Sequence, residues 1–321
     1  MVVAIVFVLF DIIYTVDAIG YTPTLRFSDD NTMPLVRDPN LRVEEVVQGL
    51  ELPTTMAFLD ADDMLVLEKD KGTVQRIVDG QIMRKPAIDV NVATEVERCM
   101  CGIAVPKNNE DPQYVFLYFS EAISKDGGEA IGNRVYRYEI LNDTLDKGKL
   151  ILDLPALPGP RHNGGAIMLG PDNNSLFVPI GDVDGSFNPD GQFVRTLTQN
   201  YMNSSIVDGR SGILAVDLNG RPIQNKGILG DSYPLVLYYA YGLRNSFGMD
   251  FDPVTGNLWD TENGPAYADE INLVEPGFNS GYTPVQGIWS HGVNPGSNVT
   301  DWEIFSPIPG GLAEFGGRGN Y

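Results

Sequence analysis

Short apolar runs, each closed by a turn, recur along the chain from about residue 54 onward. Each unit has an apolar strand, a turn rich in Asp, Pro, Asn and Gly, and a second apolar strand. A third apolar stretch follows each unit, and no long 3.6-residue periodicity appears after residue 40. This pattern indicates short β-strands instead of helices. The third stretches are residues 73–78, 133–140, 212–218 and 269–274.

The units recur at unequal intervals. The equivalent positions Met56, Ile103, Ile167 and Met249 are 47, 64 and 82 residues apart. Single strands fit a sandwich or a solenoid equally well, but repeated strand-turn-strand units followed by a third strand favour a β-propeller with one four-stranded blade per repeat. Four blades are clear, and residues 301–305 begin a fifth. The extra residues, for example about 183–210, are expected to form loops over one face, where a binding site is built.

The propeller domain is expected to span residues 42–321 and to be incomplete at its C-terminus. A propeller closes on itself to remove its strand edges, whereas this sequence stops in a Gly-rich stretch after the start of the fifth blade. We therefore expect the sequence to be a piece of a longer chain.

The N-terminus carries a short apolar segment, residues 2–10. It is shorter than the roughly 20 residues of a membrane-spanning helix and fits the hydrophobic region of a signal peptide, with a small-residue cleavage site near Ala18. No Lys or Arg precedes Arg26, so residues 1–20 are interpreted as a signal peptide or an N-terminal membrane anchor, with a buried strand as the alternative and residues 21–41 as a linker. We expect an exported protein, located outside the cell or in the cell envelope. Four N-glycosylation sequons are compatible with export, namely those at Asn142, Asn173, Asn203 and Asn298.

The charge of the chain is strongly negative. Asp and Glu number 43 against 22 Lys and Arg, which gives a net charge of −21 and a pI near 4.3. Such a field repels polyanions, so nucleic acid is excluded as a partner and anionic membrane surfaces are disfavoured. Metal ions and neutral polar molecules fit better.

Cys99 and Cys101 are the only two cysteines. Two cysteines make neither a disulfide framework nor a four-ligand zinc site. Residues i and i+2 share a face of a strand, so the pair is interpreted either as packed, reduced thiols, which we favour, or as a small redox-sensitive pair.

Four places along the chain carry candidate chemistry. His162, in a Pro- and Gly-rich turn, suits proton abstraction near neutral pH, although a loop-capping role fits these residues equally well, and His291 is interpreted as a surface loop residue. Arg244, followed by Asn245, offers a fixed positive charge for an anion, or else pairs with a carboxylate. Gly264-Pro265 and the pair Asp269-Glu270 offer oxygen ligands of the kind that calcium takes. Asp182 ends a strand, where most Asp residues cap turns.

Eight short motifs follow one another along the chain. They are Glu97-Arg98 with Gly102-Ile103-Ala104, Arg161-His162-Asn163-Gly164-Gly165, Gly170-Pro171-Asp172, Ile180-Gly181-Asp182, Tyr241-Gly242-Leu243-Arg244-Asn245, Thr261-Glu262-Asn263-Gly264-Pro265, Asp269-Glu270-Ile271-Asn272 and Asn279-Ser280-Gly281-Tyr282. In these motifs and in their order, over about residues 42–290, the chain resembles the glucose/sorbosone dehydrogenase family.

The resemblance implies a six-bladed propeller that uses pyrroloquinoline quinone (PQQ) and Ca²⁺ to oxidise an aldose at its anomeric carbon to the lactone, with an external electron acceptor. It makes His162 the general base, oriented by Asp182. It places Arg244 and Asn245 on the quinone oxygens and Glu97 near sugar and cofactor. Carbonyls of Gly264 and Pro265 would bind the calcium that holds PQQ, and a second, structural calcium would lie at Asp269, Glu270 and Tyr282.

Two other functions remain open. One is a secreted propeller of the same family that binds without catalysis, although cofactor-free relatives lose the histidine and arginine that this chain keeps. The other is a calcium-dependent lactonase-type hydrolase, for which no converging set of Asn, Asp and Glu ligands is found in the sequence.

Overall fold

The computed structural model describes residues 36–107, 113–184, 196–201, 204, 206–224, 226–264 and 269–282, and the backbone of 289–292 and 301–304. The predicted signal peptide or anchor and most of the predicted linker lie outside these ranges. Within them, no helix is long and apolar enough to cross a membrane. The only helical segments found there are two 3₁₀ turns, Leu197–Gln199 and Leu235–Leu237.

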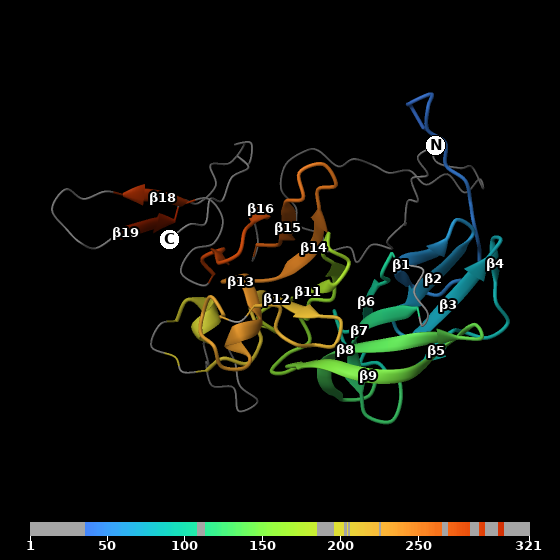
Figure 1. Ribbon diagram of the computed structural model, residues 1–321, viewed down its shortest axis with the longest axis horizontal. Helices are drawn as coiled ribbons and strands as arrows, with labels where there is room; N and C mark the ends of the chain where they lie inside the picture. Colours follow the sequence, from blue (N-terminus) through green and yellow to red (C-terminus); the bar gives the residue numbers. More distant parts are fainter. Residues whose placement is uncertain are drawn as a thin grey trace, which may run out of the picture.

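The described chain is an all-β protein whose four larger sheets are arranged as blades of a β-propeller (Figure 1). In each blade the strands lie side by side largely in chain order, and neighbours within a repeat pair antiparallel. The first strands of the first three blades contact one another and are therefore the innermost strands. The first contains β1 (Pro53–Asp60), β2 (Asp63–Glu68), β3 (Thr73–Val78), β4 (Gln81–Ile82) and β5 (Ile88–Asp89), and the second contains β6 (Met100–Ala104), β7 (Tyr114–Ala122), β8 (Ala130–Leu141) and β9 (Thr144–Leu154).

The segment that follows the fourth blade completes the third blade. The third has β10 (Met168–Leu169), β11 (Ser175–Ile180), β12 (Gly212–Asp217) and β13 (Tyr238–Tyr241), and the fourth has β14 (Ser246–Phe251), β15 (Leu258–Glu262) and β16 (Glu270–Val274). The chain then returns to the third blade, where β17 (Phe278–Asn279) pairs parallel with β13. Finally, β18 (Trp289–Gly292) pairs with β19 (Asp301–Ile304).

Apolar side chains fill the spaces between successive blades. One cluster joins the first two blades through Leu67, Val74 and Phe119. A second joins the second and third blades, and a third cluster joins the third and fourth. At about 1.5–3 kcal/mol for each large buried side chain, this packing holds the blades in a fixed relation. The loops that enter the blades are therefore held at fixed positions as well.

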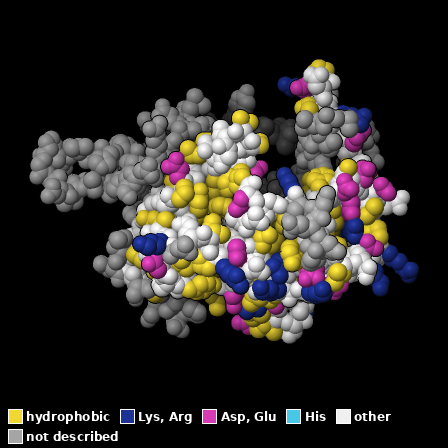
Figure 2. Space-filling model, viewed as in Figure 1, with side chains coloured by type: hydrophobic (Ala, Val, Ile, Leu, Met, Phe, Trp, Pro, Cys, Tyr) yellow, Lys and Arg dark blue, Asp and Glu magenta, His cyan; other side chains and the backbone are white. Residues whose placement is uncertain are grey.

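The fourth blade shows the period of two clearly. Leu258, Asp260 and Glu262 are buried, whereas Trp259 between them is 40% exposed. Phe247 on β14 is 72% exposed. In the face shown in Figure 2, hydrophobic side chains are visible over this part of the molecule and Lys and Arg gather over β8 and β9. The side of this blade that faces the third blade thus contains the buried acidic residues.

The strand predictions are confirmed for the repeats. The stretch at 73–78 coincides with β3, and those at 133–140, 212–218 and 269–274 correspond to β8, β12 and β16. The stretch 301–305, which was predicted to begin a fifth blade, contains β19, the second strand of a separate two-stranded sheet. The interpretation of His291 as a loop residue is wrong, because its backbone lies in β18 and pairs with Trp302.

Candidate functional site

His162 lies in the connection between β9 and β10, just before the innermost strand of the third blade. Its φ is +58°, and Gly164 and Gly165 follow with φ of +71° and +120°. A Cβ on Gly164 would lie 2.3 Å from the carbonyl oxygen of Pro179, and a Cβ on Gly165 would lie 2.5 Å from the Cβ of Cys101. Glycine is therefore required at both positions, because the turn passes too close to its neighbours for a side chain.

The residue after His162 fixes this turn to the second blade. Buried Asn163 accepts a hydrogen bond from the hydroxyl of Tyr118 through its carbonyl, at 2.5 Å. Its side-chain oxygen accepts another from Nδ2 of Asn133, at 2.8 Å. Hydrogen bonds between buried groups are costly to break, so the backbone at His162 has little freedom.

The imidazole of His162 meets Asp182, at the end of β11. Nδ1 of His162 lies 2.6 Å from Oδ1 of Asp182, and the two residues are 7% and 1% exposed. Because a carboxylate only accepts hydrogen bonds, Nδ1 carries the proton and Nε2 keeps the lone pair. The hydroxyl of Tyr282 donates to Oδ2 of Asp182, at 2.5 Å. The three side chains form a chain that presents Nε2 as a base.

Glu97 supports the same turn from the second blade. Its carboxylate accepts the backbone N–H of His162 at 2.6 Å, and its own N–H donates to the carbonyl of Pro160 at 3.2 Å. The carboxylate predicted to lie near sugar and cofactor thus holds the backbone of the predicted base.

The favoured interpretation of Cys99 and Cys101 as reduced thiols is wrong. The two form a disulfide, with their Cα atoms 5.1 Å apart. The physical reason is a β-bulge: the pairing of β6 with β7 shifts register between Met100 and Gly102. This irregularity draws the two Cα atoms closer than a regular extended strand, at about 3.3 Å per residue, would place them.

Arg244 and Asn245 lie before β14, the first strand of the fourth blade. The carbonyl of Arg244 accepts the N–H of Asp182 at 2.9 Å, which joins this segment to the His162 pair. Its guanidinium donates to the carbonyl of Asn263 at 3.0 Å. Among the described residues no ion pair joins Arg244 to a carboxylate, so the interpretation that Arg244 pairs with an acidic side chain finds no support in that part of the chain.

Gly181 is where these segments converge. A Cβ at this position would lie 2.7 Å from the carbonyl oxygens of both Arg244 and His162, and 2.8 Å from Oδ1 of Asn245. The absence of a side chain at Gly181 therefore allows the backbone segments of His162 and Arg244 to approach each other.

The predicted calcium ligands are only partly visible. Pro265 lies outside the described residues, and the N–H of Gly264 donates to Oδ1 of Asp269 at 2.9 Å. No three His, Cys, Asp or Glu side chains in the described ranges are arranged to hold a metal ion. The oxygens of Tyr282 contact Asp182 and Asn200. A second calcium at Asp269, Glu270 and Tyr282 thus gains no support from this geometry and stays a prediction.

Glu262, absent from the predicted site residues, proves central. Oε1 accepts the N–H of Arg244 at 2.5 Å, and Oε2 accepts the hydroxyl of Ser280 at 2.5 Å. Burial, together with the charges of Asp260 and Glu270, raises the pKa of Glu262 to about 8. Burial also raises the pKa of Asp260 to about 7. The alternation along β15 that places Leu258 inward also places these carboxyls inward, so this alternation is the sequence signal for their burial.

These shifts predict a loss of stability toward alkaline pH. Unfolded Glu titrates near 4.5, so the folded protein retains a proton that the unfolded chain has released. The stabilisation is complete below about pH 4.5 and disappears as pH rises to about 8. Glutamine imitates the neutral acid and does not titrate. We therefore expect Glu262→Gln to make the slope of the free energy of unfolding against pH less negative by about 1.4 kcal/mol per pH unit between these values, which corresponds to one proton. Denaturant unfolding from pH 5 to 8.5 measures it.

The matched control is Glu275→Gln, because Glu275 is exposed just after β16. It should reproduce the pH dependence of the unaltered protein. An equal slope for Glu262→Gln and the unaltered protein would contradict the buried, protonated state of Glu262.

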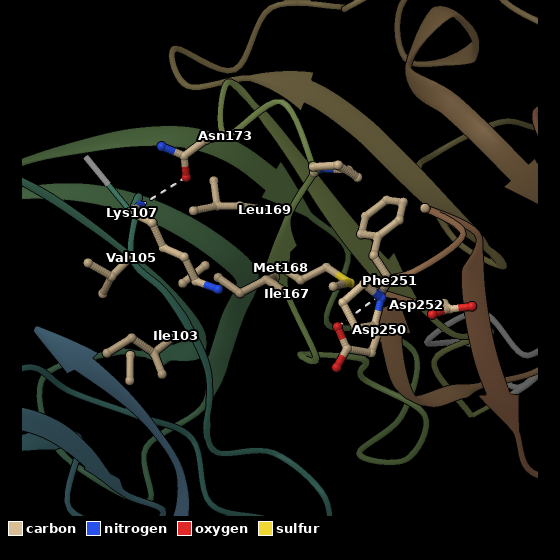
Figure 3. A pocket seen from close by; sticks show the side chains of 16 residues that line it. Ile103, Val105, Lys107, Ile167, Met168, Leu169, Asn173, Asp250, Phe251 and Asp252 are labelled. Atoms are coloured by element: carbon tan, nitrogen blue, oxygen red, sulfur yellow. Dashed lines mark hydrogen bonds between the residues drawn. The ribbon is translucent and has the colours of Figure 1, made fainter. Parts of the chain in front are cut away.

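A cavity of about 510 Å³ lies at the other ends of the innermost strands. It is lined by residues at or just after the ends of β6, β10 and β14, such as Val105, Leu169 and Asp252 (Figure 3). Lys107 and Asp250 come from opposite walls, with Met168 between them (Figure 3). His162 and Arg244 precede β10 and β14, and Asp182 follows β11, which pairs antiparallel with β10. The candidate site is therefore at the opposite strand ends, and the cavity is not part of it.

The donor set fits an anionic, planar quinone. Arg244 provides guanidinium N–H groups, and a buried donor next to His162, Nδ2 of Asn163, has no hydrogen-bond partner in the described structure. Unpaired buried polar atoms cost free energy unless a ligand or water satisfies them. Asn163 was not predicted to contact PQQ, and its unpaired donor is the one observation beside Arg244 that fits an electron-rich ligand here.

Comparison with known proteins identifies a family and several relatives. The family model "Glucose / Sorbosone dehydrogenase" matches residues 50–304. Quinoprotein glucose dehydrogenase B of Acinetobacter calcoaceticus is 26% identical over 268 residues, which cover 78% of this chain and 54% of that protein. The chain thus spans about half to three fifths of the length of the curated relatives it matches.

Two solved structures are similar in fold. A Thermus thermophilus protein described as an oxidoreductase (glucose dehydrogenase) aligns with a TM-score of 0.63 and 31% identity, over 79% of this chain and 70% of that one. The PQQ-bound form of aldose sugar dehydrogenase from Streptomyces coelicolor aligns with a TM-score of 0.59 and 25% identity, over 76% and 66%. On the strength of the family match and of the propeller, the chain belongs to the glucose/sorbosone dehydrogenase family.

Proposed function

We propose that this protein oxidises an aldose sugar at its anomeric carbon to the lactone, with PQQ as the oxidant and His162 as the general base. The observation that carries the proposal is the arrangement of base and cation. Asp182 orients His162, and the carbonyl of Arg244 is hydrogen-bonded to Asp182. Family membership supports sugar oxidation in general, and the PQQ-bound Streptomyces relative supports the choice of cofactor.

The task of His162 is to remove the proton of the anomeric hydroxyl. Its Nδ1 is occupied by Asp182, so Nε2 accepts this proton, and the carboxylate stabilises the imidazolium that results. The hydrogen on the anomeric carbon leaves with its electron pair as hydride. Loss of one proton and one hydride turns the anomeric alcohol into the lactone carbonyl. When bound, PQQ supplies the quinone that takes up the hydride.

Arg244 would hold the cofactor from the other side of the site. A guanidinium is always charged and donates several N–H bonds in one plane, which suits quinone and carboxylate oxygens. Asn245 would add an amide beside it. Developing negative charge is stabilised best by donors that are fixed in advance, and Arg244 is fixed through Glu262 and Asn263.

Reconstitution tests the proposal. The protein is mixed with PQQ and Ca²⁺ and assayed for reduction of an external dye with a panel of aldoses, in parallel with samples lacking PQQ or sugar. We expect dye reduction only when both are present. Dye reduction by no aldose, with PQQ shown to be bound, would contradict the proposed activity.

Removal of calcium is a separate prediction. If carbonyls at Gly264 and Pro265 hold Ca²⁺ beside PQQ, a chelator should abolish PQQ binding and lower the melting temperature, and added Ca²⁺ should restore both. PQQ binding is followed by equilibrium dialysis and melting by calorimetry, with Mg²⁺ as the control ion because it demands a smaller octahedral site. A chelator that changes neither quantity would refute the calcium assignment.

A further inference from the structure

The phenol of Tyr282 ends the hydrogen-bond chain that begins at His162. Its hydroxyl is 2.5 Å from Oδ2 of Asp182, and Oδ1 of the same carboxylate is 2.6 Å from Nδ1 of His162. The exposed fractions of the three residues are 9%, 1% and 7%. Both oxygens of the buried carboxylate are therefore engaged, one on each side.

The backbone of Tyr282 is itself held on both sides. Its N–H donates to the carbonyl of Gly242 at 2.9 Å, and its carbonyl accepts Nδ2 of Asn200 at 2.8 Å. Asn200 is held in turn by Asn279, because the two side-chain amides exchange hydrogen bonds at 2.7 and 2.9 Å. The backbone of Tyr282 is thus held in place, and its phenol reaches from there to Asp182 at the end of β11.

We propose that Tyr282 is a positioning residue for the Asp182–His162 pair, which keeps the carboxylate turned toward Nδ1 and His162 in the tautomer with a free Nε2. The kinetic consequence of this assignment rests on the proposed function, whereas the structural consequence does not. The assignment gives Tyr282 a role in orienting the base, in addition to the calcium role that the family resemblance implies.

The physical reason is the cost of an unsatisfied carboxylate oxygen. Asp182 is almost completely buried, so losing the phenol donor leaves Oδ2 with a weaker set of partners in a site of low dielectric constant. The carboxylate then gains by rotating toward other donors, and its contact with Nδ1 is weakened. A base that is misdirected in this way loses rate without losing affinity for the sugar.

The first test reads the histidine directly, in the protein without PQQ. The sequence has two histidines, so the ¹⁵N-labelled His291→Gln variant leaves the ring signals of His162 alone. In this background we expect a low-field Nδ1–H proton resonance for His162. Adding Tyr282→Phe should shift it upfield or remove it through exchange with water.

The matched control is Tyr238→Phe. Tyr238 is also buried, but its hydroxyl donates to a backbone carbonyl, that of Arg210, at 2.8 Å, and not to the carboxylate of Asp182. This change should leave the His162 resonance in place. An unchanged resonance in Tyr282→Phe, or an equal change in both variants, would overturn the assignment.

A fluorinated tyrosine at position 282 covers the case in which Tyr282→Phe does not fold. It keeps the ring and hydroxyl while making the phenol a stronger donor. The Nδ1–H resonance should then move relative to that of the unaltered protein, and no movement would again overturn the assignment.

The second test is kinetic. Tyr282→Phe should lower kcat of the PQQ-loaded protein by about 10-fold to 100-fold, the range that one hydrogen bond to a charged group is worth, with KM within about a factor of two. If the unaltered protein oxidises no sugar while the NMR change occurs, the proposed function fails and the positioning role stands. Unchanged kcat in Tyr282→Phe would contradict the role in catalysis.

Discussion

The variant His162→Gln is expected to turn over sugar about 10²–10⁴-fold more slowly than the unaltered protein, the usual contribution of a positioned general base. Glutamine keeps a polar side chain of similar reach but cannot accept and hold a proton at neutral pH. PQQ should still bind, because Arg244 and Asn245 are unchanged. Steady-state dye reduction with the sugar in excess measures the turnover, and titration with PQQ confirms that the cofactor site is intact.

The control for this result is His291→Gln, which removes the other histidine of the sequence. It should retain full activity. Turnover of His162→Gln within about a factor of three of the unaltered protein would show that another group takes the proton, because this residual activity is far above the expected range.

The substitution Gly181→Ala should disable the site through its geometry. The added Cβ would come within 2.7 Å of two backbone oxygens and 2.8 Å of the Asn245 amide, so the segments of His162 and Arg244 must move apart. Misplacement by about 1 Å can cost 100-fold in rate, and overpacking of this kind costs about 1–3 kcal/mol of stability. We expect turnover to fall by about 100-fold or more and the melting temperature to fall by several degrees.

Gly248→Ala is the matched control in the adjoining strand β14. A Cβ at Gly248 would meet only the hydroxyl of Thr261, at 3.2 Å, which a small movement of one side chain relieves. Calorimetry and the dye assay should therefore show values close to those of the unaltered protein. If Gly181→Ala behaves like Gly248→Ala, the positions of the His162 and Arg244 segments do not require a glycine at position 181.

Most of the fold was predictable from sequence because blades are local structures. The hairpin of β1 and β2, and the strand β3 after it, follow from apolar alternation and turn residues alone. The return of β17 to pair with β13 could not be predicted, because this two-residue parallel pairing joins segments that are far apart in the sequence. The disulfide was misjudged for a similar reason: it depends on a bulge in β6 that arises from pairing with β7.

The candidate site was predictable where chemistry is concentrated in rare residues. His162 and Arg244 could be found from composition and motif, and the resemblance implied the pairing with Asp182. Glu262 and Gly181 were missed as site residues because their importance lies in what they touch. Alternation along β15 indicates that Glu262 is buried, but a single sequence does not show that its carboxyl accepts a distant backbone N–H, or that Gly181 leaves room for two carbonyls.

Some exposed turns lie at the strand ends opposite to the His162 turn, which has a practical consequence. The turn between β8 and β9, at Asn142 and Asp143, is exposed and lies at the ends of its strands that face away from the His162 turn. The turn between β14 and β15 lies at that same end, and Val254 within it is 90% exposed. An affinity tag, a fluorophore or a solid support attached at these turns would orient every molecule alike, with the imidazole side directed toward the surrounding solution.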